Sequence, residues 1–515
     1  MNVPYRDLGK SKETFSLVSA TFFRYVAILW IVKVATAASP NVLFIVADDL
    51  NTTIGCYGGN VITPNLDALA RSGLLFSRAY CQESVCGPSR NSVLSGLRPD
   101  TDHERIGRGN SAGPELRKLM PGAVTLPELF KRNGYHTVSI GKVYHHGEVE
   151  TGGPVGPRMP RDELSWSDEP WYHGTPYQQW YEQESFDLTE KMRSIPATGR
   201  PRIIRGLPYE SSQHPDDVYA DGQIANQAIL TLRRIKDQTF FMALGFRRPH
   251  LPFNCPKKYW DLYPESEFGL PDNYYPPRNV PKVALHDAYE LRSYADIPAS
   301  GPIPEQHTQN LVRGYKAAAS YMDAQLGRVM AELEQLGLAE NTLVMFWSDH
   351  GYHTGENSLW TKMTNFEIAT RVPLIVRMPN QPTRGVQSAA LVELVDLYPT
   401  LAELCELTPP DYLEGKSFAP LFRNPEQPWK EAVYSQFRRG LDSRENRPNR
   451  PLGRSMATAL YRYTEWRTQE GESLGTELYN LKHDPQNNVN LAGLAEYDEL
   501  VHRLSSQLGD SPLSR

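Results

Sequence analysis

The chain has 515 residues, of which 40% are hydrophobic and 22% charged, and it carries a formal net charge of −6. This length is enough for one large core or two domains, and the composition is that of a folded soluble protein. The negative charge excludes a general nucleic-acid binder, because that role requires a basic face. A local basic pocket for a small anion remains possible.

The N-terminal region carries a candidate export signal. Residues 22–38 form a short apolar run that is interrupted by Lys33 and contains an Ala-Thr-Ala cleavage pattern. The run is short for a transmembrane helix and is typical of a secretory signal, with an uncleaved anchor as the alternative. We therefore predict a signal peptide at 1–37 and no stable membrane insertion. The protein would be periplasmic or secreted, or lysosomal in a eukaryote.

Strand and helix patterns alternate along the next part of the chain. Short apolar runs predict strands at 41–47, 137–140, 239–244, 342–347 and 372–376. Helical spacing of apolar residues predicts helices at 64–72, 216–236 and 313–336. This alternation is typical of an α/β fold, with a parallel sheet covered by helices on both faces. In such sheets, ligands bind at the carboxyl ends of the strands.

The remaining segments divide into two kinds. Residues 148–212 and 263–308 are irregular and rich in proline, and we expect them to cover a site. After residue 425, further short strands are predicted at 432–436, 459–466 and 477–481, with a closing helix at 494–508. We therefore predict a large domain at 38–425 and a smaller C-terminal α+β subdomain at 426–515.

Acidic residues follow two of the predicted strands. Asp48 and Asp49 come directly after the first strand, and Asp349 and His350 follow the strand at 342–347. Carboxylates held close together repel each other unless a cation neutralises them, and hard oxygen ligands suit Ca²⁺ or Mg²⁺. His350 could add a nitrogen ligand. The alternative is that the acidic pairs are helix caps.

Basic and imidazole side chains are further candidates. Lys142 and His145 follow the strand predicted at 137–140, His250 follows the one at 239–244, and Lys362 lies between the strands predicted at 342–347 and 372–376. Each one alone is more often a surface lysine or a structural histidine. Together around a metal they would hold the oxygens of a tetrahedral anionic ester and protonate its departing oxygen.

A thiol lies at the predicted start of a short helix. The segment Cys86-Gly87-Pro88-Ser89-Arg90 places proline at the first helical position, and Gly96 should end the helix. Cys86 would then face the positive end of the helix dipole, with Arg90 one turn further on to hold the nucleophile or an oxyanion. The alternative is a buried structural thiol. The chain has five cysteines, an odd number, so disulfides leave at least one thiol unpaired.

The cysteine segment resembles a known family signature. With Leu94-Ser95-Gly96 it is similar to the C-x-P-S-R…L-T-G-R motif of the formylglycine-dependent (type I) sulfatases. It departs from that motif at Ser95 and Leu97. Further segments occur in the family's order at 41–49, 141–145, 245–253, 348–356 and 359–373. Within that family, the likeness is greatest to the iduronate-2-sulfatase group. It rests on the segments Gly-Lys-Val-Tyr-His, Arg-Pro-His-Leu-Pro-Phe and Asp-His-Gly.

This resemblance implies a fold and a chemistry. The fold would be alkaline-phosphatase-like, with a large mixed, mostly parallel sheet flanked by helices. The activity would be hydrolysis of sulfate esters of a sulfated carbohydrate, in glycosaminoglycan degradation. A maturation enzyme would oxidise Cys86 to formylglycine, whose hydrate attacks sulfur and forms a covalent sulfo-enzyme.

The resemblance also implies a role for each candidate. One Ca²⁺ would be bound by Asp48, Asp49, Asp349, His350 and the modified Cys86. Arg90 would help to activate the nucleophile, while His145 would help to release sulfate. The remaining candidates, Lys142, His250 and Lys362, would hold the sulfate oxygens, and His250 or Lys362 would protonate the leaving oxygen.

Two other functions stay open at this point. The first is a phosphodiesterase or phosphonate hydrolase of the same superfamily, since that chemistry also uses a metal and an alkoxide. The second is a sulfoglycan-binding protein without turnover, which would result if Cys86 remained a thiol.

Overall fold

The computed structural model describes residues 39–99, 117, 121–145, 162–172, 180–194, 206–264, 269–439 and 450–514. These residues fall within one compact unit, Ser39–Arg515. The predicted signal peptide at 1–37 lies outside the described residues.

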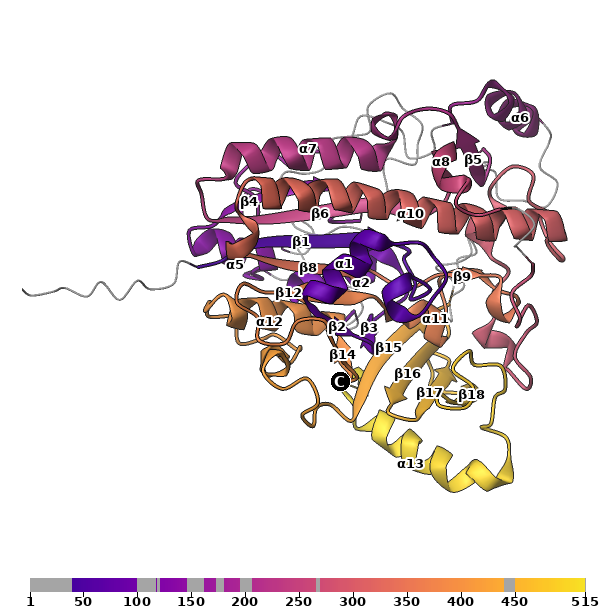
Figure 1. Cartoon of the computed structure of the whole chain (residues 1–515). Coiled ribbons are helices and arrows are strands. Elements are labelled where there is room, and N and C mark those ends of the chain that lie inside the picture. Colours follow the sequence, from indigo (N-terminus) through magenta and orange to yellow (C-terminus); the bar gives the residue numbers. More distant parts are fainter. Residues whose placement is uncertain are drawn as a thin grey trace, which may run out of the picture. The chain divides into compact units, whose positions relative to one another are not determined.

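A seven-stranded mixed sheet forms the centre of this unit, in the order β13-β2-β12-β8-β1-β6-β4 (Figure 1). Four adjacent strands run parallel: β8 (Thr342–Ser348), β1 (Asn41–Asp48), β6 (Phe240–Pro249) and β4 (His136–Gly141). The outer strands are β12 (Leu374–Arg377), β2 (Leu74–Phe76) and β13 (Val386–Ser388). β12 is antiparallel to both of its neighbours, so the sheet is mixed, as the family resemblance implied.

Both faces of the sheet are covered by helices, because its central strands are apolar on both sides. One face packs against α2 (Cys86–Ser95), α5 (Leu126–Arg132) and α12 (Leu397–Leu404). The other packs against α1 (Pro64–Ser72), α7 (Ala220–Ile235) and α10 (Glu305–Gln335). Along β1, Phe44 belongs to the first core and Ile45 to the second. This alternation in a fully buried strand explains its continuous apolar sequence.

Some element boundaries differ from the predicted ones. α10 begins at Glu305, directly after Pro304, and not at residue 313. The apolar run at 372–376 is divided into β11 (Arg371–Val372) and β12. Pro373 separates the two strands, because proline has no N–H to donate to a ladder.

The C-terminal part contains a four-stranded antiparallel sheet (Figure 1). Its strands are β15 (Ala432–Arg438), β16 (Leu452–Thr458), β17 (Tyr461–Arg467) and β18 (Ser473–Asn480). β16 was not among the predicted strands. On one face of this small sheet, Trp466 packs against Phe366, which lies in a loop beside the large sheet. On the other face, Tyr463 packs against α13 (Asp498–Gly509).

The two segments predicted as irregular contain short elements. Residues 263–308 include η5 (Lys282–Ala284) and α9 (Tyr289–Arg292). The described part of 148–212 includes α6 (Gln183–Ser194) and β5 (Tyr209–Ser212), and β5 pairs with β7 (Phe253–Pro256). Among the described residues, no helix has the length and apolarity needed to cross a membrane. All five cysteines lie in the described ranges, and each has a free thiol.

Candidate active site

The candidate residues meet at the carboxyl ends of the four parallel strands. Asp48 is the last residue of β1, and Lys142 and His250 directly follow β4 and β6. Asp349 and His350 directly follow β8. Because these strands are neighbours and parallel, residues far apart in the sequence converge at one edge.

The backbones of β4 and β6 approach each other closely beside Lys142, and this contact positions Lys142 at the site. Gly245 in β6 lies so near β4 that a Cβ atom there would be 2.0 Å from the Lys142 carbonyl oxygen. Gly141 has a positive φ of 74° and would place a Cβ atom 2.2 Å from the Gly245 carbonyl oxygen. Only glycine fits at either position. The Lys142 ammonium is consequently ion-paired with Oδ2 of Asp48, which is fully buried.

Asp49 adopts a backbone conformation that is uncommon for a residue with a side chain. Its φ is 69°, and its N–H donates to Oδ1 of Asp349 at 3.2 Å. Tyr315 in α10 donates its hydroxyl to the Asp49 carbonyl oxygen at 2.9 Å. The same hydroxyl accepts from the Asn51 N–H at 2.8 Å. These contacts hold a conformation that costs energy, and such conformations are typical of functional sites.

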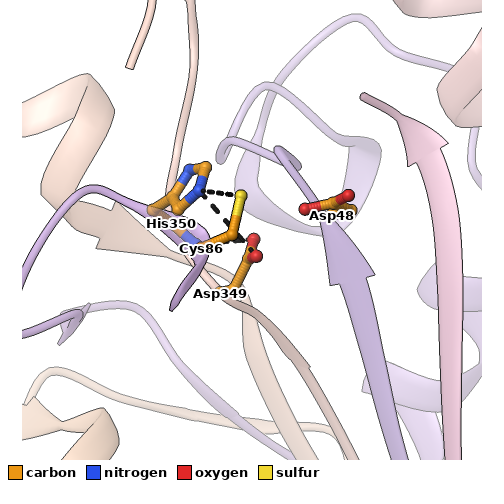
Figure 2. A group of neighbouring side chains, drawn as sticks. All are labelled: Asp48, Cys86, Asp349 and His350. Carbon is orange, nitrogen blue, oxygen red and sulfur yellow. Dashed lines mark hydrogen bonds and ion pairs between the residues drawn. The ribbon is translucent and has the colours of Figure 1, made fainter. Parts of the chain in front are cut away.

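Cys86 lies at the first position of α2. The helix thus begins two residues before Pro88, the predicted first position, which is possible because the early N–H groups of a helix have no helical partner. It ends as predicted at Gly96, whose φ is 73°. The Cys86 Sγ atom is 3.2 Å from Nε2 of His350. Figure 2 shows Cys86 beside His350 and Asp349, with Asp48 from β1 nearby.

Arg90 is joined to two of the site's carboxylates. Its Nε donates to Oδ2 of Asp349 at 2.8 Å, and its Nη2 lies 3.4 Å from Oδ1 of Asp48. Nη1 donates to the Val143 carbonyl oxygen at 3.1 Å and also to that of Lys142. Arg90 therefore fixes two carboxylates and the end of β4 in one geometry. That its guanidinium also holds the nucleophile or an oxyanion stays a prediction.

A second group of contacts surrounds Lys362 and His250. Lys362 Nζ is 3.1 Å from Nε2 of His250 and 3.2 Å from Oδ2 of Asp49. Sequence analysis missed Glu290, whose carboxylate reaches both bases from α9, at 2.9 Å from Lys362 and 3.2 Å from His250. No motif marked Glu290, because it lies in one of the segments that read as irregular.

Burial and the nearby charges shift the pKa values of the site's acids in different directions. Burial alone would raise the pKa of Asp48, but Lys142, His250 and Arg90 outweigh burial and hold it well below its usual value. Burial raises the pKa of Asp49 and prevails over the nearby bases. Burial also raises the pKa of the Cys86 thiol well above its usual value. An unmodified Cys86 is thus held as a neutral thiol.

The donor set fits a hard divalent cation. Ligand atoms of Asp48, Cys86, Asp349 and His350 all lie within 4.8 Å of one another, and all four residues are buried. Asp49 forms a second such group with Cys86 and His250. The buried Oδ1 atom of Asp49 accepts no hydrogen bond from the described residues, although Nδ1 of His350 lies 3.4 Å away. A cation would satisfy that oxygen, and the carboxylates favour Ca²⁺ or Mg²⁺.

His145 lies three residues after Lys142 and is half-buried. Its role, like the roles of the other candidate residues, stays a prediction.

Comparisons with known proteins identify the family of this chain. The Sulfatase family model matches residues 40–407, and the model for the C-terminal part of N-sulphoglucosamine sulphohydrolase matches residues 355–512. Iduronate 2-sulfatase of Homo sapiens is 33% identical over 499 residues, covering 84% of this chain and 86% of that protein. These matches extend over most of the chain.

Solved structures share the fold. A putative sulfatase from Bacteroides thetaiotaomicron has a TM-score of 0.68 at 22% identity, covering 92% of each chain. A phosphonate monoester hydrolase of Agrobacterium radiobacter has the same TM-score and identity, covering 91% of this chain and 94% of that one. The family match and the site define an ester hydrolase with a possible metal site. The chain belongs to the sulfatase family and is a sulfuric ester hydrolase.

Proposed function

We propose that this enzyme removes sulfate from a sulfated carbohydrate, and that its substrate is iduronate 2-sulfate or a similar sulfated sugar in a glycosaminoglycan. The observation that carries the reaction is the placement of Cys86 among two carboxylates and an imidazole, with Sγ 3.2 Å from Nε2 of His350. The likeness to iduronate 2-sulfatase supports the substrate class.

Cys86 would act after oxidation to formylglycine by a maturation enzyme. The hydrate of formylglycine supplies one hydroxyl that attacks sulfur and a second that allows sulfate to leave by elimination. Asp48, Asp49, Asp349, His350 and the modified Cys86 would hold one Ca²⁺, which would supply positive charge to activate the nucleophilic hydroxyl and to screen the anionic ester. Arg90 would help to activate the nucleophile, and its ion pairs keep Asp48 and Asp349 in place.

The bases around the site would bind the ester. Lys142 and Lys362 are buried ammonium groups, and each can donate to a sulfate oxygen while remaining paired with an aspartate. His250 Nε2 lies 3.1 Å from Lys362 Nζ, so one of the two can protonate the departing sugar oxygen. His145 would help the second hydroxyl to lose its proton.

Two measurements test this proposal. Peptide mass spectrometry across Cys86 should show a loss of about 18 Da, because sulfur is replaced by oxygen and two hydrogens are removed. A panel of defined sulfated sugars should then show release of sulfate, with iduronate 2-sulfate among the best substrates. An unmodified thiol in active enzyme would refute the nucleophile, and activity on other sugars alone would refute the substrate.

The shared fold of the phosphonate monoester hydrolase supports one alternative, hydrolysis of phosphonate or phosphate esters. Comparing sulfate and phosphonate esters of the same alcohol with one preparation separates the two functions. A sulfoglycan-binding protein without turnover would bind the sugars and release no sulfate.

We also propose that the protein is exported through the segment at 1–37, and that domains extend over 38–425 and 426–515. The apolar run and the Ala-Thr-Ala pattern support the export signal. N-terminal sequencing of the secreted or periplasmic protein should give a start near Ala38. Recovery of an uncut chain would favour the anchor.

A further inference from the structure

Glu290 places a carboxylate beside His250 and Lys362, two of the bases that are proposed to bind the ester. It lies in α9, outside the strands that carry the other site residues. Its Oε1 atom is 3.2 Å from Nε2 of His250, and its Oε2 atom is 2.9 Å from Nζ of Lys362. The side chain is only 11% exposed, so water screens its charge poorly.

The segment that carries Glu290 is fastened on both sides. Nε2 of His286 lies 3.0 Å from the Lys362 carbonyl oxygen, and Nδ1 accepts from the Ala288 N–H at 3.0 Å. Burial and the charge of Arg439 lower the pKa of His286 to about 3, so the ring is neutral and donates from Nε2. Arg292 donates to the carbonyl oxygens of Pro298 and Gly301, both at 2.7 Å. These contacts keep the carboxylate at its position.

Lys362 is also held in position independently of Glu290. The residues on either side of it, Thr361 and Met363, have positive φ values of 72° and 62°. Met363 donates its N–H to the Ser84 carbonyl oxygen at 3.2 Å, and Arg439 donates to the Met363 carbonyl oxygen at 2.8 Å. The ammonium group is therefore fixed between two carboxylates, Asp49 and Glu290.

An anionic ester bound to Lys362 must share the ammonium with Glu290. Two anions that each accept a hydrogen bond of about 2.9 Å from one nitrogen are roughly 5 Å apart. At that distance and with little screening, like charges repel appreciably. The repulsion grows with the charge of the ester. A sulfate monoester carries one negative charge, whereas a phosphate monoester has a second pKa of about 6 and carries two at pH 8.

We propose that Glu290 determines specificity in this site by disfavouring esters with two negative charges. This inference rests on the proposed function, because it assigns the ester to Lys362 and His250. Glu290 touches these two bases and sets the charge that the incoming ester meets.

Three esters test the inference by their charge. At pH 8, 4-nitrophenyl sulfate and bis(4-nitrophenyl) phosphate carry one negative charge, and 4-nitrophenyl phosphate carries two. We expect Glu290→Gln to raise kcat/KM for the phosphate monoester relative to the sulfate ester by about 10-fold or more, since an unscreened unit charge at this range is worth at least that factor. The ratio of phosphate diester to sulfate ester should change less than about threefold.

Matched variants separate charge from structure. Glu290→Asp keeps the charge and should keep the wild-type ratio. Asp287→Asn removes an exposed charge from the same segment and should also leave the ratio unchanged. If Glu290→Gln has no turnover, calorimetric Kd values for the phosphate and sulfate monoesters in a Cys86→Ala background give the same ratio without catalysis.

The outcomes are distinguishable. An unchanged ratio in Glu290→Gln, or an equal rise for the diester and the monoester of phosphate, would overturn the inference while leaving the proposed function intact. A wild-type enzyme that releases no sulfate from any ester would instead refute the proposed function.

Discussion

Arg90 donates from Nε to Oδ2 of Asp349 at 2.8 Å, and both side chains are completely buried. The two residues are 259 positions apart in the sequence. This pair joins the second turn of α2 to the residue that directly follows β8, and it keeps a guanidinium beside the carboxylates proposed to bind the metal.

Arg90→Met should therefore destabilise the protein as well as inactivate it. Loss of the guanidinium removes an ion pair from each of two buried carboxylates, and breaking a buried pair costs about 3–5 kcal/mol. Urea unfolding should show a lower midpoint, and turnover should be lost. Lys257→Ala removes an exposed ion pair with Asp261 and should leave both the unfolding midpoint and turnover nearly unchanged. An Arg90 variant of normal stability would contradict the role given to this pair.

Cys86→Ala should abolish release of sulfate and leave the fold intact. Among the described residues the thiol makes one hydrogen bond, with His350, and alanine lacks only the sulfur atom, so the fold should tolerate the change. Circular dichroism and the unfolding midpoint report the fold. Cys405→Ala is the matched control, because that thiol is also buried but lies in the apolar core, so turnover should persist. Near-normal turnover of Cys86→Ala would refute the nucleophile.

Calcium should bind and stabilise the protein, and a chelator should abolish its enzymatic activity. A ligand at 100 times its Kd stabilises the folded state by about 2.7 kcal/mol, so added Ca²⁺ should raise the thermal midpoint. Calorimetry should show one site per chain in the wild type and much weaker binding to Asp49→Asn. Asp411→Asn removes an exposed carboxylate and should bind as the wild type does. Full activity in chelator would contradict the metal assignment.

Acid should destabilise the protein partly through His286. Its pKa is lowered from 6.5 to about 3 in the folded state, so the unfolded chain binds the proton more tightly. The stability from this residue is complete above pH 6.5 and is lost as the pH falls towards 3, by at most about 1.4 kcal/mol per pH unit. His286→Asn should flatten that dependence in urea titrations at several pH values. His502→Asn changes an exposed histidine and should leave the pH dependence of stability unchanged.

Gly245→Ala should displace Lys142. The added methyl group would lie 2.0 Å from the Lys142 carbonyl oxygen, so the end of β4 must move. We expect a loss of about 1–3 kcal/mol in the free energy of unfolding and a large fall in kcat. Gly493→Ala is the control, because a methyl group there meets no atom within 4 Å. Unchanged kcat in Gly245→Ala would show that Lys142 is not positioned by this contact.

The amino-acid sequence alone was enough to locate the central strands and the acidic residues at their ends. Continuous apolar runs identified β1, β4, β6 and β8, because strands buried on both faces need no polar alternation. The carboxyl ends of parallel strands lie together, so Asp48 and Asp349 could be expected at one edge. The cysteine motif located Cys86 and the end of its helix at Gly96.

The direction of β12, the partners of Arg90 and the position of Glu290 became known only from the folded chain. β12 has the hydropathy of a buried strand, and hydropathy does not depend on the direction of the chain. Arg90 pairs with carboxylates at the ends of β1 and β8, and Glu290 reaches Lys362 from a four-residue helix. Such contacts depend on how the whole chain packs, whereas propensity and periodicity act over a few residues.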